Sequence, residues 1–166
     1  MHRFKLEIKW AFIFMLALLL WMELERAAGL HDRNIHLHQY LTMLYVIPAV
    51  WIYVLALKDI KKKYYKGVMN FKQGLVSGLM ITLVVAVFSP LLQWIISFVI
   101  TPDYFNNVIE YSLQTGYMES RTAAEAHFNF KSYALSSVMF AIVSGIITSL
   151  LVAFFVKTKN KPTLEQ

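Results

Sequence analysis

The sequence predicts an all-α polytopic membrane protein, with four transmembrane helices and short amphipathic interfacial helices between the third and the fourth. Of its 166 residues, 58% are hydrophobic and only 16% are charged, whereas a soluble domain is nearer half apolar and a quarter charged. The apolar residues also cluster into four long segments, which favours membrane spans over one large soluble core. Residues 1–166 are therefore expected to form a single four-span membrane domain.

Three of the predicted spans are free of charged residues. Residues 41–57 and 134–156 come close to the roughly 20 residues that a helix needs to cross about 30 Å of hydrocarbon. The uncharged segment 75–100 is longer, so this helix must tilt, or bend at Pro90, the expected kink.

The first predicted span, about residues 8–28, is less regular than the others. Its purely apolar part is short, and Glu23, Glu25 and Arg26 follow directly after it. A cleaved signal peptide is the alternative reading, but its cleavage region should be neutral, and here it would carry these three charges. Sliding the helix outward, so that its amino-terminal lysines extend to the membrane surface, is a further way to accommodate them.

The basic residues predict the orientation of the spans. Twelve of them fall at the amino terminus, between spans two and three, or after span four: Arg3, Lys5, Lys9, Lys58, Lys61, Lys62, Lys63, Lys66, Lys72, Lys157, Lys159 and Lys161. Only Glu7, Asp59 and Glu165 accompany them, whereas the other side carries four basic and seven acidic residues. Because cytoplasmic segments are enriched in Lys and Arg, both termini are predicted to be cytoplasmic. The lysines of residues 58–66 serve as a topology anchor, with anionic lipid head groups as an alternative partner.

The composition also excludes several classes of function. The net charge of +6 comes with lysines that flank apolar segments, so the expected partner is the lipid bilayer and not nucleic acid. The chain has no cysteine, which excludes disulfides and thiolate chemistry. It contains no Walker, HExxH or GxSxG motif, so we expect no enzyme and no cofactor.

Small residues recur every fourth position in spans three and four. The two ladders are Gly74, Gly78, Thr82 and Ala86 in span three, and Ser137, Ala141, Gly145 and Ser149 in span four. Residues four apart share a helix face, and small side chains there let two membrane helices approach closely. The ladders predict a contact between spans three and four within one subunit; a face for a homo-oligomer or an unknown membrane partner is the alternative.

Residues 101–133 are predicted to form two short amphipathic helices at the outer interface. Pro102 suits the first position of a helix after Thr101, and Gly116 suits its end. The stretch TAAE at residues 122–125 resembles a capping box, and this second helix is expected to continue into span four.

The most polar stretch follows span one and contains the candidate polar cluster: Glu23, Glu25, Arg26, His31, Asp32, His36 and His38. The favoured hypothesis is a structural cap in which the two glutamates bond Arg26, Arg33 or histidines of the same turn, with no metal, because no familiar zinc spacing is present. The alternative is a site for protons or a metal ion. Whether any two of these acids and histidines come within ligand reach separates the two hypotheses.

Four stretches of the sequence resemble a known family. GLHDRNIHLHQYLTMLYVIPA, YYKGVMNFKQG, FSPLLQW and TPDYF are similar to the bacterial four-span proteins grouped as domain of unknown function 4199, with Gly67, Phe71, Gly74, Ser89 and Pro90 carrying most of the likeness. The resemblance covers nearly the whole chain and implies a bacterial inner (plasma) membrane. The family has no established activity, so it implies no catalytic residues.

Two functions from different classes remain open. The first is a non-enzymatic membrane scaffold or accessory subunit, which the shortage of polar groups within spans two to four favours. The second is a small transporter, or a protein that handles metal ions or protons, using the polar outer end of span one.

Overall fold

The computed structural model describes residues 3–158, which form helices and turns without a strand. Its elements are α1 (Arg3–Ala27), α2 (Ile35–Leu41), the 3₁₀ turn η1 (Thr42–Tyr45), α3 (Val46–Lys63), α4 (Phe71–Ile95), the π-helical segment η2 (Ile96–Ile100), α5 (Tyr104–Gln114), α6 (Arg121–His127) and α7 (Phe130–Val156). The side chain of Arg3 and residues Lys159, Lys161 and Glu165, which enter the charge count above, lie outside the described residues.

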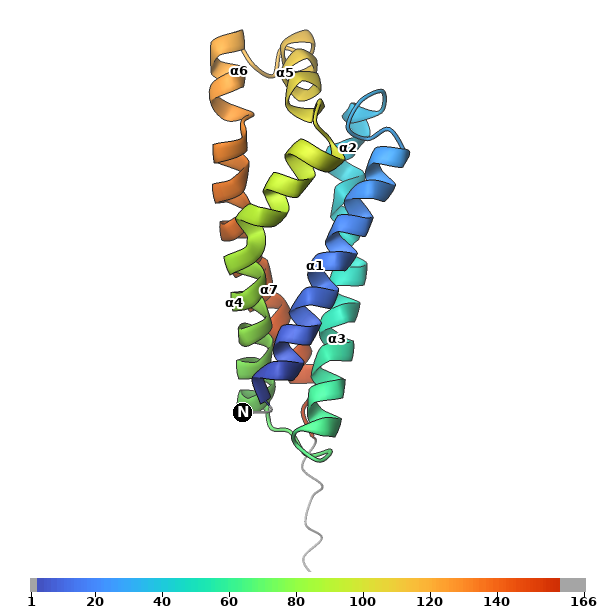
Figure 1. Ribbon diagram of the computed structural model, residues 1–166, viewed down its shortest axis with the longest axis vertical. Helices are drawn as coiled ribbons and strands as arrows, with labels where there is room; N and C mark the ends of the chain where they lie inside the picture. The colour runs from blue at the N-terminus through green and yellow to red at the C-terminus, as the bar shows by residue number, and fades with distance from the viewer. Residues whose placement is uncertain (1–2, 159–166) are drawn as a thin grey trace, which may run out of the picture.

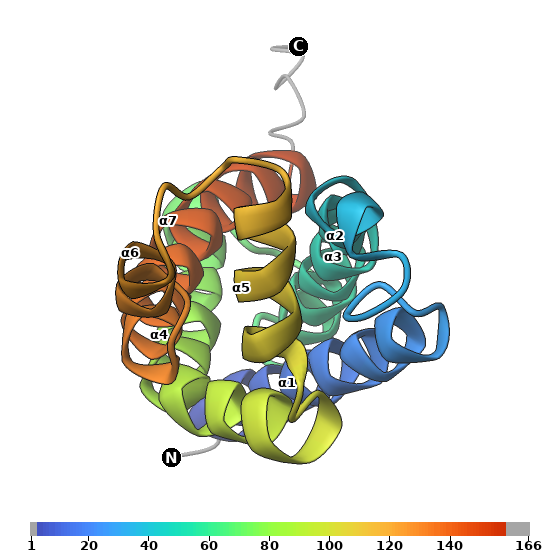
Figure 2. The same cartoon turned by 90° about the horizontal axis from the view of Figure 1, so that it is seen from above.

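The four long helices α1, α3, α4 and α7 run side by side along the length of the molecule (Figure 1). The amino terminus and the connection between α3 and α4 lie at one end, which we call the lysine end. Helices α2, α5 and α6 lie at the other, which we call the capped end. Figure 2 shows α5 lying across the capped end, so this short helix covers the tops of the long ones.

Three segments are long and apolar enough to cross a membrane: Ile35–Lys63, Phe71–Ile100 and Phe130–Val156. The chain is therefore an all-helical protein of multi-pass membrane character, as the sequence predicts. Helix α1 does not meet the same criterion, because charged residues flank its apolar centre on both sides.

Side-chain caps set the first residues of two long helices, which extend beyond the uncharged segments 75–100 and 134–156. Helix α4 begins at Phe71, since Asn70 and Gln73 form a reciprocal capping box with two 2.9 Å hydrogen bonds. Helix α7 begins at Phe130, since the Asn129 side chain accepts a 3.0 Å hydrogen bond from the Ser132 amide.

The segment between η2 and α7 differs from its predicted boundaries. Helix α5 starts at Tyr104 and not at Pro102, because the Thr101 amide bonds the Ile96 carbonyl at 2.8 Å and closes the π-helical turn. Ser120, and not Thr122, caps α6: its hydroxyl accepts a 3.2 Å bond from the Ala123 amide. Helix α6 does not continue into α7, because the backbone of Phe128 leaves the helical conformation between them.

Helices α4 and α7 make the closest contact of the bundle, where their small residues face each other. A Cβ atom placed on Gly78 would lie 2.6 Å from Ser149 Oγ, and one on Gly145 would collide with Thr82. The buried Thr82 hydroxyl is bonded: Thr82 Oγ1 donates to the Gly78 carbonyl at 3.1 Å and lies 2.8 Å from the Tyr53 hydroxyl. Only small side chains therefore allow the two backbones this close.

Helix α4 changes direction toward the capped end. Pro90 lies inside the helix, and Figure 1 shows its yellow-green end leaning toward α1. Proline removes one helical hydrogen bond and crowds the preceding turn, which is a common cause of such a bend.

Helix α1 contacts both α3 and α4. Its buried face holds Glu7, Ala11, Met15 and Glu25. Its opposite side exposes a large apolar residue at every fourth position: Phe4, Ile8, Phe12, Leu16, Leu20 and Leu24. An acid therefore lies on the buried face near each end of this helix.

Candidate functional site

A tight turn at the end of α1 folds the chain back over the helix. The Leu30 amide bonds the Glu25 carbonyl at 3.0 Å, and the Gly29 amide bonds the Arg26 carbonyl at 2.9 Å. This pair of bonds is the Schellman pattern, and it needs a left-handed residue, here Gly29 with φ of +74°. The Asn34 side chain closes the turn with a 2.9 Å bond to the Ala28 carbonyl. The turn buries Leu30 and brings His31 back to Glu25.

Three buried or half-buried side chains meet there, and we call them the Glu–His–His cluster: Glu25, His31 and His38. Glu25 Oε2 lies 3.2 Å from His31 Nε2 and 3.3 Å from His38 Nδ1. One ligand atom from each of the three residues falls within 4.8 Å of the others. His38 reaches the cluster from α2, so the site joins three consecutive pieces of chain: the end of α1, the turn and α2.

Aromatic residues surround the cluster. The Trp21 indole nitrogen, one helical turn before Glu25, donates to Glu25 Oε1. The Tyr104 ring from α5 lies edge-on to both imidazoles, with ring centroids 5.5 Å from His31 and 5.4 Å from His38. Asn107, also on α5, donates a 2.9 Å bond to the His31 carbonyl. Helix α5 thus covers the cluster and holds its backbone in place.

The burial of a carboxylate makes this arrangement chemically unusual. Glu25 is 2% exposed and His31 is 5% exposed, and a buried carboxylate is costly unless a positive group accompanies it. That charge can come from a protonated imidazole or from a metal ion. Burial and the neighbouring Tyr133 and Glu25 raise the pKa of the Tyr104 phenol well above its ordinary value.

The nitrogen atoms of the cluster are only partly satisfied. His31 Nδ1 and His38 Nδ1 are buried and have no hydrogen-bond partner among the described residues, although His38 Nδ1 is close to Glu25. A tetrahedral zinc ion with bonds of about 2.0–2.1 Å holds its ligand atoms about 3.3 Å apart. The 3.2 and 3.3 Å separations around Glu25 Oε2 are close to that spacing, and they are also those of an ion pair between a carboxylate and an imidazole.

The other members of the predicted polar cluster lie outside the Glu–His–His cluster. Glu23 and Arg26 form an exposed pair at 3.6 Å on α1. Asp32 and His36 are exposed and line a neighbouring pocket of about 340 Å³, together with Glu110 of α5. Arg33 lines the same pocket and does not reach either glutamate in an ion pair among the described residues.

Sequence reasoning missed the residues that surround the cluster. Trp21 carried a usable signal, because it precedes Glu25 by four residues and so shares its helix face. Tyr104 and Asn107 carried none, since they reach the cluster only through the path of the chain after α4.

The comparisons with known proteins identify a family and no nearer relative. The family model described as protein of unknown function (DUF4199) matches residues 9–158. No curated protein and no solved structure matches the chain. The geometry above is therefore the only guide to function.

Proposed function

The chain belongs to the DUF4199 family of proteins of unknown function, and we propose that it is a non-enzymatic accessory protein of the bacterial inner membrane that binds one zinc-class metal ion. The observation that carries this proposal is the convergence of Glu25, His31 and His38 on one point. By the criterion of ligand reach, this convergence supports the metal-handling alternative.

Helix α1 is the proposed fourth span. Its 25 residues extend about 37 Å at 1.5 Å per residue, enough to cross the hydrocarbon. The apolar stripe from Phe4 to Leu24 suits contact with lipid, while Glu7 and Glu25 are turned to the buried side. The exposed Glu23–Arg26 pair then lies near the membrane surface, where a paired charge costs little.

The proposed orientation puts the lysine end in the cytoplasm and the capped end in the periplasm. Its support is the distribution of twelve basic residues against four. Helices α5 and α6 then lie at the periplasmic interface. Their support is that α5 buries Val108, Ile109 and Ser112 on one side and exposes Asn106 and Glu110 on the other.

The donor set favours a zinc-class ion over magnesium or calcium. Imidazole nitrogen with one carboxylate suits zinc, copper or nickel, whereas magnesium and calcium take oxygen ligands. Three protein ligands leave a fourth tetrahedral position for water. The Trp21 bond to Glu25 and the Asn107 bond to the His31 carbonyl orient the ligands, as outer partners of metal sites do.

The pocket beside the cluster offers an approach for a cation. Asp32 and Glu110 place acidic groups in its wall, and Asn107 belongs both to that wall and to the cover over His31. Toward the cytoplasmic side, the buried face of α1 continues with Met15 and Ala11 before it reaches Glu7. Met15 and Ala11 supply no oxygen or nitrogen ligand between the two buried acids, which supports binding over transport.

Zinc titration of the purified, metal-stripped protein tests the proposal. We expect one zinc per chain by elemental analysis after buffer exchange. We also expect a higher melting temperature, since a ligand at 100 times its Kd stabilises the folded state by about 2.7 kcal/mol. Glu25→Gln and His38→Ala should each abolish the stoichiometric zinc.

Two neighbours provide matched controls. Glu23→Gln and His36→Ala remove the same chemical groups two residues away, from exposed positions, and should keep one zinc per chain. Wild-type protein that binds no zinc, copper or nickel above the level of the Glu25→Gln variant would overturn the proposal and leave a structural cap.

A further inference from the structure

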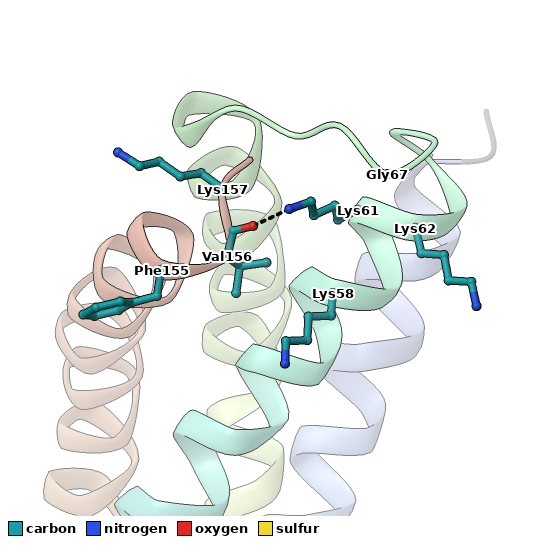
Figure 3. Close-up of a pocket in the computed structure, with 7 residues that line it drawn as sticks. All are labelled: Lys58, Lys61, Lys62, Gly67, Phe155, Val156 and Lys157. Atoms are coloured by element: carbon teal, nitrogen blue, oxygen red, sulfur yellow. Dashed lines mark hydrogen bonds between the residues drawn. The ribbon is translucent and has the colours of Figure 1, made fainter. Parts of the chain in front are cut away.

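A second pocket lies at the opposite end of the molecule, between the ends of α3 and α7. It encloses about 510 Å³ and is lined by Lys58, Lys61, Lys62, Gly67, Phe155, Val156 and Lys157. Figure 3 shows Lys58 reaching into the space between the two helix ends, while the side chains of Lys62 and Lys157 point away from it on either side. Four of the seven lining residues are lysines and none is acidic, so the pocket is chemically suited to an anion.

Hydrogen bonds between distant segments fix the walls of this pocket. Lys61 Nζ on α3 donates to the Val156 carbonyl at the end of α7, at 2.8 Å. Beside it, the Met69 amide donates to Thr158 Oγ1 at 2.9 Å, and the Thr158 amide donates to the Met69 carbonyl at 2.8 Å. The loop before α4 is thereby tied to the end of α7, and the pocket is preformed.

The lysines of the pocket keep their charges available. Asp59 is the acid nearest in sequence to Lys58, and it pairs instead with Lys63 at 2.8 Å and with Lys9 at 4.0 Å. Among the described residues, no carboxylate pairs with Lys58, Lys62 or Lys157. Lys157 lies over the Phe154 ring at 4.3 Å, which holds it at the pocket edge without neutralising it.

Below the lysines the same two helix faces become apolar. Trp51 and Leu55 precede Lys58 by seven and three residues on α3, so they share its face. Leu151 precedes Phe155 by one turn on α7, and Phe155 is 78% exposed. A cationic edge above exposed apolar side chains matches the division of a phospholipid into a charged head and acyl chains.

We propose that the pocket at the lysine end binds one anionic phospholipid. The phosphate lies against Lys58, while Lys61, Lys62 and Lys157 add positive charge around it, and an acyl chain runs along the exposed apolar residues below. The shared chemistry is that of a phosphate group, and these apolar residues assign it to a lipid and not to free phosphate. This inference rests on different residues from the metal site and does not depend on it.

Native mass spectrometry of the detergent-solubilised full chain tests the inference, with dioleoyl phosphatidylglycerol as the probe and dioleoyl phosphatidylcholine as its zwitterionic match. We expect one phosphatidylglycerol per chain bound at least tenfold more tightly than phosphatidylcholine. The double variant Lys58→Gln/Lys157→Gln should weaken the binding of phosphatidylglycerol on the order of tenfold, because each lysine near an anionic lipid adds to the binding free energy. Lys66→Gln/Lys72→Gln removes the same charge outside the pocket lining and should change binding less than twofold.

Three results would overturn the inference. Equal loss in both double variants would indicate a general electrostatic attraction and not a site. Equal binding of phosphatidylcholine would remove the role of the charge. Displacement of the lipid by millimolar inorganic phosphate would reassign the pocket to a free anion. Unchanged melting temperatures of the two double variants keep these comparisons valid.

Discussion

The α4–α7 contact and the Glu–His–His cluster both bury polar atoms, but they do so in opposite ways. At the α4–α7 contact the buried groups are small hydroxyls, and Thr82 bonds the carbonyl of its own helix. At the capped end the buried groups are a carboxylate and two imidazoles, whose nitrogens are only partly bonded. The first region is a packing contact of small groups, whereas the second leaves two buried imidazole nitrogens without a hydrogen-bond partner among the described residues.

Gly78→Leu should cause the largest loss of stability, because it places a large side chain where α4 and α7 leave no free space. Even a Cβ would lie 2.8 Å from the Ser149 Cβ, so the two helices must separate. We expect a loss of about 1–3 kcal/mol in unfolding free energy, or about 2–4 °C in melting temperature per kcal/mol for a chain of this size. Thermal unfolding in detergent measures it.

Val76→Leu is the control for that variant, since Val76 lies two residues away on the exposed side of α4. It should leave the melting temperature unchanged. Equal melting temperatures for Gly78→Leu and wild type would show that α4 and α7 do not pack as described.

Glu25→Gln in the metal-free protein should cause the second-largest loss of unfolding free energy. The amide keeps the shape but removes the charge that accepts from Trp21 and faces His31, for which we expect a loss of about 1–2 kcal/mol. Glu23→Gln removes only an exposed pair and should cost below about 0.5 kcal/mol. Urea unfolding of the two variants compares them directly, and an equal cost would contradict the buried position of Glu25.

Asn107→Ala tests the cover that α5 makes over the cluster. Losing the bond to the His31 carbonyl should cost about 1 kcal/mol and should speed amide exchange in the turn at residues 28–34. Asn106→Ala, at an exposed neighbouring position, is its control. Hydrogen-exchange mass spectrometry resolves the two, and unchanged exchange in Asn107→Ala would show that α5 does not hold the turn.

Arg121→Gln should have the smallest effect. Arg121 pairs with Glu110 and Glu125, but all three side chains are more than half exposed. Solvent and salt screen such pairs, so we expect a melting temperature within experimental error of the wild type. A clear drop would mean that the contact between α5 and α6 depends on this pair.

The sequence predicted the features that repeat along the chain. Helical content and three helices long and apolar enough to cross a membrane follow from runs and periods of residue types, and both are confirmed. The family, predicted from the resemblance of four stretches, is confirmed as well. The positions of Gly78 and Ser149 in two ladders also follow from a period of four. The predicted ends of the short helices were less accurate, because a cap depends on a single residue. The cap of α6 was predicted at Thr122, and the structure has it at Ser120.

The candidate site was only partly predictable for a physical reason. Glu25, His31 and His38 are all in the predicted polar cluster, but their spacing in the sequence does not resemble a metal motif. The Schellman turn at Gly29 brings His31 back by reversing the chain, and such a reversal does not appear as a period. Tyr104 comes from a helix 66 residues after His38 in the sequence, so no local pattern connects them.

The number of residues in the π-helical segment η2 affects the direction in which the Tyr104 side chain points. Its bond from the Thr101 amide to the Ile96 carbonyl spans five residues where an α-helix spans four, so the turn contains one residue more than an α-helix would. Deleting a single residue from Ile96–Ile100 would restore an α-helical turn, and because the residue removed is the extra one, the chain after it would keep nearly the same direction. Tyr104 would then stay over the two imidazoles. A second deletion would remove a residue from a turn that is already α-helical, rotate everything after it by about 100°, and so uncover the cluster without altering any of its members.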